Sequence, residues 1–132
     1  LLWLEFRRVL FRSLRDYKKY LTSEMVSKID STISTEILNY INKNYKVITL
    51  KSMADHFSYN PDYIGKLIKK VIGRNLTELI KEKKIKEAEY LLHNTKMSVI
   101  EVITEVGYSN VSYFYRQFKD QVGVTPDEYR RK

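Results

Sequence analysis

The sequence predicts an all-α fold of about seven helices, in which two tandem helix-turn-helix subdomains of three helices each are joined by one long linker helix. Gly and Pro contribute only 4 and 2 of the 132 residues, so there are few candidates for tight hairpin turns. Apolar residues recur at helical spacing between capping residues along most of the chain. A short helix, a tight turn and a longer helix are expected twice, which is the order of elements in a helix-turn-helix.

The composition limits the class of protein. The chain has 24 Lys and Arg against 16 Asp and Glu, a net charge of +8, which favours a polyanionic partner such as nucleic acid, or less commonly a membrane surface. A basic surface without any such role is the alternative. Cysteine is absent, so this chain has no disulfide, thiolate metal site or cysteine nucleophile, which fits a cytoplasmic, nucleoid-associated protein. No apolar run approaches the roughly 20 residues that span a bilayer, and no membrane partner is expected.

The first residues differ in character from the rest. The string LEFRRVLFRS (4–13) resembles a translated sequencing-library adapter, and we interpret residues 1–13 as an artefact of sequence assembly. A genuine basic amphipathic helix is the alternative. If the adapter interpretation holds, the natural protein extends upstream, and an effector or receiver domain is expected to be missing there.

The first subdomain is expected at 34–73, after a helix stub and linker at 14–33. The stretch from Ser27 to Thr35 is rich in Ser and Thr and is the best candidate for the linker itself. The first helix of the subdomain is expected to begin at Ser34 or Thr35 and to end near Asn44. Its second helix follows the cap Thr49. Its third runs from the cap Asn60 to Gly73, with Pro61 at the first helical position, where a missing N–H costs nothing.

The linker helix is expected from Leu76 to Asn94, within 74–96, and is about 28 Å long at 1.5 Å per residue. The second subdomain, 97–132, repeats the first: Ser98 caps a short helix, Asn110 caps a longer one that ends at Gly123, and Thr125 begins a last turn. The matching core positions are Met53 with Val102, Phe57 with Val106, Ile64 with Phe114, and Ile68 with Phe118. On this pattern alone, a plain helical bundle with repeated hairpins is the alternative.

The string VIEVITEVGYSNVSYFYRQFKDQVGVTPDEYRR (99–131) resembles the signature of the AraC/XylS family of transcription regulators. Upstream, 37–73 and 84–92 are similar to the first half and the linker helix of the family, so the resemblance covers about Thr35 to Arg131. It implies sequence-specific binding of double-stranded DNA by two recognition helices in adjacent major grooves, roughly 34 Å apart. It also makes RNA polymerase a candidate partner. The alternative function is that of a DNA-targeting module of an enzyme, such as an alkylation-repair protein.

The resemblance assigns the contacts by position. Base readers of the second recognition helix are Val111, Ser112, Tyr115 and Arg116. Arg116 is expected to read guanine O6 and N7, and a phosphate clamp is its alternative role. In the first helix the matching residues are Asp62, Gly65 and Lys66. Gly65 has no side chain to read with and Asp62 repels phosphate, so the first subdomain is expected to read less sequence than the second.

Phosphate contacts are expected to position the domain without reading sequence. The candidates are Tyr63, Lys69, Lys70, Arg74, Tyr113 and Lys119. Lys81, Lys83, Lys84 and Lys86 are interpreted as the solvated face of the linker helix, with phosphate contacts as the alternative. His56 and His93 are isolated at helix ends, so no metal site, catalytic residue or cofactor is expected, and the chain is not expected to be an enzyme.

Overall fold

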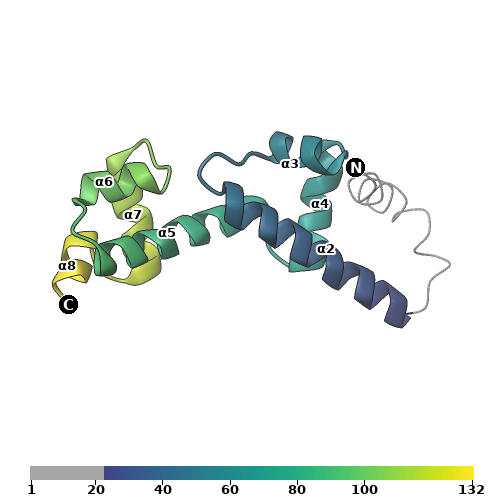
Figure 1. Cartoon of the computed structure of the whole chain (residues 1–132), viewed down its shortest axis with the longest axis horizontal. Coiled ribbons are helices and arrows are strands. Elements are labelled where there is room, and N and C mark those ends of the chain that lie inside the picture. The colour runs from purple at the N-terminus through teal and green to yellow at the C-terminus, as the bar shows by residue number, and fades with distance from the viewer. Residues whose placement is uncertain (1–22) are drawn as a thin grey trace. The chain divides into compact units, whose positions relative to one another are not determined.

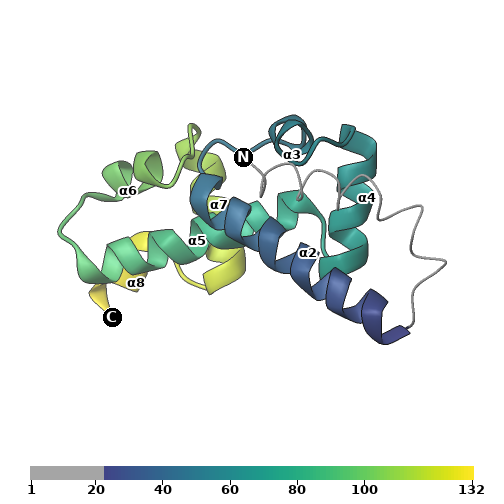
Figure 2. The same cartoon turned by 45° about the vertical axis from the view of Figure 1, so that its right-hand side comes forward.

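The computed structural model describes residues 23–132 and confirms the all-α fold (Figures 1 and 2). Within that range there are seven helices and no strand: α2 (Ser23–Asn44), α3 (Leu50–Phe57), α4 (Pro61–Ile72), α5 (Leu76–Asn94), α6 (Val99–Glu105), α7 (Val111–Val122) and α8 (Pro126–Arg131). The adapter-like segment 1–13 and the helix expected from Leu14 lie outside the described residues, except for the last residues of that helix.

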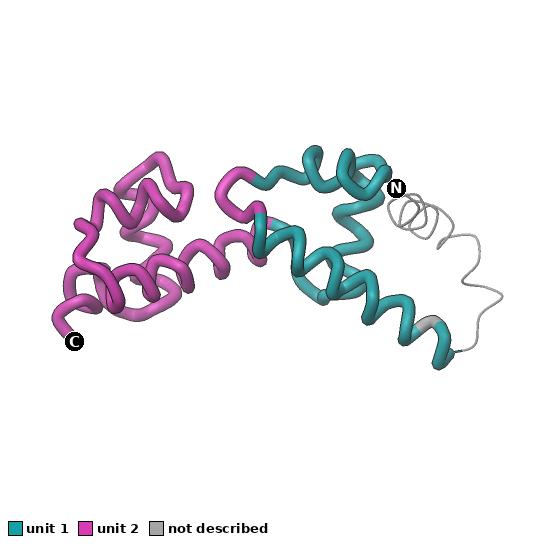
Figure 3. The backbone as a smooth tube through the Cα atoms, in the orientation of Figure 1, with its two compact units in different colours: residues 1–43, 48–76 teal, residues 44–47, 77–132 magenta. Residues whose placement is uncertain are grey.

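The chain forms two compact units (Figure 3). In the described part, unit 1 comprises residues 23–43 and 48–76, and unit 2 comprises 44–47 and 77–132. Unit 1 therefore holds α2, α3 and α4, while all but the first residue of α5 belongs to unit 2 together with α6, α7 and α8. The four residues 44–47 leave the end of α2 and belong to unit 2.

Helix α2 begins at Ser23, so the expectation of a polar linker ending at a cap near Ser34 was wrong. Three hydroxyls in this stretch donate to the carbonyl four residues earlier in the helix: Thr32 Oγ1 to Lys28 at 3.0 Å, Ser34 Oγ to Asp30 at 2.8 Å and Thr35 Oγ1 to Ser31 at 3.0 Å. Ser and Thr hydroxyls satisfied in this way are compatible with a continuous helix. Ile33 and Ile37 are fully buried, and the apolar spacing of four extends the core stripe upstream of the predicted start.

The other helix starts agree with the sequence-based caps. The Asn60 side chain accepts from the Tyr63 amide at 2.7 Å, and the Asn110 side chain accepts from the Tyr113 amide at 2.9 Å. Thr49, Ser98 and Thr125 cap α3, α6 and α8 in the same way. Such caps satisfy amides that a helix leaves without partners, so they fix where each helix begins.

Unit 2 has one apolar core, built where α5 packs with α6 and α7. Its buried members are Ile85, Ala88, Leu92, Val102, Ile103, Val106, Phe114 and Phe118. Helix α8 closes this unit: the Arg130 Nε donates to the Leu92 carbonyl at 3.2 Å, in the last turn of α5, and the Tyr129 ring lies 5.7 Å from the Phe118 ring, edge to face. The buried side chains of unit 1 come from α2, α3 and α4 and from Ile48 and Leu76.

Candidate nucleic-acid interface

Helices α4 and α7 occupy equivalent positions in the two units. Both have 12 residues, an Asn N-cap and a Gly C-cap in the left-handed conformation. Positions therefore correspond at a separation of 50, and the inward residues Ile64 and Phe114 are both fully buried, as are Ile68 and Phe118. Because the caps fix the register, the outward residues of the two helices can be compared one by one.

The outward face of α7 carries most of the predicted readers. Val111 is 41% exposed, and Ser112 and Arg116 are also exposed. Ser112 and Arg116 are four residues apart and lie on the side of the helix that faces away from Phe114 and Phe118, whereas Val111 is the exposed first residue of α7 and follows the stripe of those two rings. The predicted phosphate contact Lys119 is exposed one turn further along this side. The first two turns of α7 thus present an apolar group, a hydroxyl and a guanidinium to solvent together.

The Arg116 guanidinium lies against an aromatic ring. Its central carbon is 5.8 Å from the centroid of the Tyr113 ring, within the range of a cation–π interaction. Tyr113 is 43% exposed, and its ring is 5.9 Å from that of Tyr108. A long Arg side chain loses rotamer freedom when it binds, so a ring that holds it beforehand lowers that cost. Tyr113, predicted only as a phosphate donor, is also placed to orient Arg116.

Tyr115 is half-buried at the edge of this face. Its ring packs on the core of unit 2, 6.2 Å from the Phe114 ring, and its hydroxyl donates to Asp127 Oδ2 of α8 at 3.0 Å. Burial, and then the hydrogen bond to Asp127, raise the pKa of the Tyr115 phenol. Sequence reasoning missed Asp127, because a contact between side chains of two different helices leaves no local pattern.

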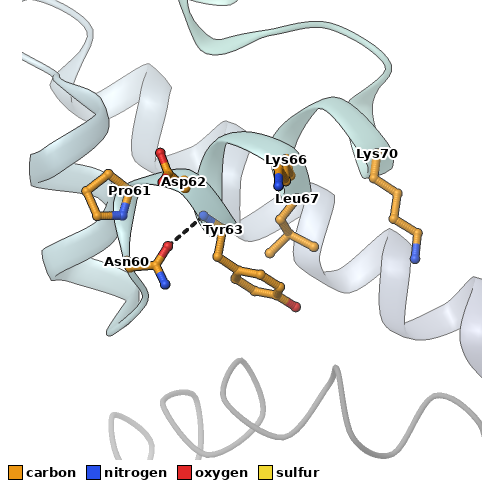
Figure 4. Close-up of a pocket in the computed structure, with 7 residues that line it drawn as sticks. All are labelled: Asn60, Pro61, Asp62, Tyr63, Lys66, Leu67 and Lys70. Atoms are coloured by element: carbon orange, nitrogen blue, oxygen red, sulfur yellow. Dashed lines mark hydrogen bonds between the residues drawn. The ribbon is translucent and has the colours of Figure 1, made fainter.

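The outward face of α4 borders an open hollow of about 680 Å³ (Figure 4). Among its lining residues are the predicted contacts Asp62, Tyr63, Lys66 and Lys70, and the cap Asn60 also borders it. The lining does not include Gly65, nor the predicted phosphate contacts Lys69 and Arg74. The side chains of Lys69 and Arg74 are exposed. The outward face of α4 combines several cations with one carboxylate.

Glycine at position 65 is not required by the packing. A Cβ added there would lie 3.5 Å from the nearest side-chain atom of Leu50, which is an ordinary van der Waals contact. Its equivalent in α7 is Tyr115, and the equivalent of Lys66 is Arg116. The two helices therefore share a backbone design and differ in the side chains that they offer to a ligand.

The lysines of α5 are mostly engaged within unit 2. Lys83 Nζ is 2.8 Å from Glu87 and Lys86 Nζ is 2.8 Å from Glu82. Lys84 is half-buried: its Nζ donates to the Gly107 carbonyl at 3.1 Å and lies 5.2 Å from the centre of the Tyr108 ring, and burial lowers its pKa. The interpretation of Lys84 as part of a solvated face was wrong, because its stem continues the buried side of α5 beside Ala88.

Both histidines of the described chain lie in the last turn of a helix. His56 stacks on Tyr40 with the ring centroids 4.2 Å apart, and His93 is exposed at the end of α5. Among residues 23–132, no group of three or more His, Asp or Glu side chains could hold a metal ion. In the same range, no helix is both long and apolar enough to cross a membrane.

Comparison with known proteins places the chain among transcription regulators. A family described as a helix-turn-helix domain matches residues 53–132. The uncharacterized HTH-type transcriptional regulator YdiP of Escherichia coli (strain K12) is 34% identical over 98 residues, 74% of this chain and 32% of that protein. The bifunctional transcriptional activator/DNA repair enzyme AdaA of Bacillus subtilis (strain 168) is 32% identical over 96 residues, 72% of this chain and 46% of that protein.

Solved structures share the fold. The C-terminal domain of AraT, a response regulator from Geobacillus stearothermophilus, matches with a TM-score of 0.70 and 32% identity, covering 75% of this chain and 84% of that one. AraC-type regulators are among the other structures with this fold. The chain spans about a third of the length of YdiP and less than half of that of AdaA.

Proposed function

The chain belongs to the AraC family of helix-turn-helix DNA-binding transcriptional regulators, and from this premise we propose that α7 reads most of the base sequence while α4 mainly positions the domain on the DNA backbone. Helix-turn-helix proteins place the recognition helix in the major groove and contact base edges with its first turns. Helices α4 and α7 each follow the tight turn of such a motif. Their outward residues decide what each can read.

The observation that carries the proposal is the difference at two equivalent pairs of positions. Where α7 has Arg116, exposed and lying against the Tyr113 ring, α4 has Lys66. A guanidinium can bond guanine O6 and N7 with two parallel donors, whereas an ammonium acts as a point charge. Where α7 has Tyr115, α4 has Gly65, which offers no side chain to a base. Helix α7 therefore has more groups with a defined donor or acceptor geometry.

The exposed cations of α4 support a positioning role. Four basic residues lie on or just after α4: Lys66 in its first half, Lys69 and Lys70 in its second half, and Arg74 two residues after its end. Phosphate contacts of this kind set the register of a protein on the duplex without reading its sequence. They also release counterions, so affinity falls with added salt in proportion to the number of phosphates that are neutralised. The carboxylate of Asp62 opposes phosphate on the same face.

The test compares Arg116→Ala with Lys66→Ala on a DNA site selected for the wild-type chain and on an unrelated duplex. We expect Arg116→Ala to lose about 1–3 kcal/mol of binding to the selected site and little on the unrelated one. Lys66→Ala should weaken both duplexes to a similar extent and reduce the slope of log K against log salt by about one phosphate contact. Equal loss on both duplexes for Arg116→Ala would show a phosphate clamp and contradict the proposal.

A DNA-targeting module within an enzyme is the second candidate, and the similarity to AdaA favours it. That protein is named as both a transcriptional activator and a DNA repair enzyme, and the match covers 46% of its length. The sequence of this chain contains no cysteine, so it supplies no thiol to accept an alkyl group. The thiol would have to come from another part of the whole protein, so the test uses the full-length protein. Transfer of an alkyl group from alkylated DNA to the full-length protein would favour the second candidate, and lesions left in place would argue against it.

We propose two further features of the whole protein, a second domain and a protein partner. The relatives YdiP and AdaA are much longer than the matched region, and the AraT structure is of one domain of a response regulator. This supports the proposal that an effector or receiver domain accompanies the DNA-binding part and that RNA polymerase is a second partner. Recovery of the genomic sequence around this coding region would test the first, and co-purification of the full-length protein with RNA polymerase on promoter DNA the second.

A further inference from the structure

The hydrogen bond between Tyr115 and Asp127 restricts what the Tyr115 hydroxyl can offer to DNA. The hydroxyl oxygen lies 3.0 Å from Asp127 Oδ2, and an ionised carboxylate can only accept hydrogen bonds. The single phenolic proton is therefore directed at Asp127. What remains on the oxygen is acceptor capacity.

The rest of the environment keeps the hydroxyl in this state. The ring packs on the core of unit 2 and makes an edge-to-face contact with the buried Phe114, which limits rotation of the side chain. Burial and the bond to Asp127 both raise the phenol pKa, so the proton stays on Tyr115 at neutral pH. Asp127 itself is in the first turn of α8, after the cap Thr125, so its backbone position is fixed by the helix start.

We propose that Tyr115 is a specificity-determining residue that accepts a hydrogen bond from an exocyclic amino group in the major groove, selecting adenine or cytosine over guanine or thymine on the contacted strand. This inference rests on the proposed role of α7 as the main reading helix. In the major groove, adenine N6 and cytosine N4 are donors, whereas guanine N7 and O6 and thymine O4 are acceptors. A keto base opposite Tyr115 would face an oxygen whose proton is already committed.

The position of Tyr115 fits this role. It lies next to Arg116, which is exposed on the outward face, and one turn after Val111, the exposed first residue of α7. A Tyr hydroxyl without a carboxylate partner could serve as donor or acceptor and would tolerate either class of base. Because Asp127 takes the phenolic proton as a hydrogen-bond acceptor, the Tyr115 hydroxyl can only accept a hydrogen bond from a base. Unit 1 has no equivalent, since the matching residue in α4 is Gly65.

The experiment is a randomised-site selection with the wild-type chain and with the variants Tyr115→Phe, Asp127→Ala, Asp120→Ala and Arg116→Ala. We expect one position next to the Arg116-dependent base at which the wild type prefers amino over keto bases by about tenfold, a typical cost for one mismatched contact. Tyr115→Phe should abolish this preference. Asp127→Ala should also abolish it, because the hydroxyl is then free to donate. Asp120 is exposed on α7 and its loss removes the same charge, so Asp120→Ala should keep the preference.

Several outcomes would overturn the proposal. A preference that survives in Tyr115→Phe would show that Tyr115 does not read the base, and a keto preference that this variant loses would show that the hydroxyl donates. Equal effects of Asp127→Ala and Asp120→Ala would reduce the role of Asp127 to its charge. If the amide spectrum of Asp127→Ala shows that α8 is lost, Tyr115→Phe decides alone. Failure of the proposed function would be seen separately, as a selected site that Arg116→Ala leaves unchanged.

Discussion

Substitution of Gly107 by Ala tests whether residues 44–47 are an integral part of unit 2. Gly107 ends the short helix of the second helix-turn-helix with a φ of +90°, and an added Cβ would lie 2.8 Å from the Lys46 carbonyl oxygen and 3.1 Å from its Cα. These are backbone atoms, so they cannot move aside as a flexible side chain would. The segment they belong to is held by the ion pair between Lys46 Nζ and Glu105 at 2.7 Å and by the packing of Tyr45 on the core.

The expected cost has two parts. The left-handed conformation costs a residue with a Cβ about 1–2 kcal/mol. The stiffer unfolded chain offsets about 0.4–1 kcal/mol of this. Displacement of the Lys46 backbone would also pull the neighbouring Tyr45 partly out of the core, and the lost burial of that side chain costs about 1–2 kcal/mol. The sum is a destabilisation of unit 2 by about 2 kcal/mol, enough to lower its urea midpoint clearly.

Gly123→Ala is the matched control. Gly123 has a φ of +92°, also in unit 2, but an added Cβ there would meet nothing within 4 Å. It should therefore show only the backbone strain less the same offset, with a net cost of about 1 kcal/mol. Urea titrations followed by residue-resolved amide signals would report unit 2 separately from unit 1. If Gly107→Ala destabilises unit 2 no more than Gly123→Ala does, the packing of Gly107 against Lys46 does not contribute to stability. Residues 44–47 would then not be an integral part of unit 2.

Three further results are expected. Gly65→Ala should stabilise unit 1 by about 0.5–1 kcal/mol in a urea titration, because the helical site has room for a Cβ; destabilisation would show that the space is not available. Burial raises the pKa of Tyr108 from 10.0 to about 12, so the stabilisation of unit 2 by the protonated phenol is complete below pH 10 and is lost as the pH rises towards 12. This loss of stability at high pH should be smaller in Tyr108→Phe. An equal loss in that variant would show that Tyr108 is not its source. Tyr113→Leu should weaken binding to the selected DNA site more than Tyr113→Phe does, because the ring orients Arg116; equal losses would assign the effect to the hydroxyl.

Local signals were sufficient for most of the fold. The caps Thr49, Asn60, Ser98, Asn110 and Thr125 each accept from an amide in the first turn, so helix starts could be predicted from residues three positions apart. The bounds predicted for the long helix, Leu76 to Asn94, match α5. The start of α2 was missed because Ser and Thr can cap a helix or bond back inside one, and only the buried Ile33 and Ile37 distinguish the two.

The sequence predicted which residues form the site, but the contacts between these residues could be found only in the structure. Exposure of Arg116, Ser112 and Lys66 follows from helical periodicity alone. The bond from Tyr115 to Asp127 joins two helices, and the bond from Lys84 to the Gly107 carbonyl joins residues 23 positions apart. Such pairs depend on how helices pack, which no short-range spacing encodes. The roles of individual side chains toward DNA remain predictions.

Randomised-site selection with the wild-type chain would show whether the two recognition helices read unequal amounts of sequence. The bases contacted by each helix would be identified by the positions that change in Arg116→Ala and in Lys66→Ala. We expect the Arg116-dependent positions to hold most of the sequence information, with guanine at one of them and weak preferences at the Lys66-dependent positions. Equal information in the two sets of positions would contradict the account.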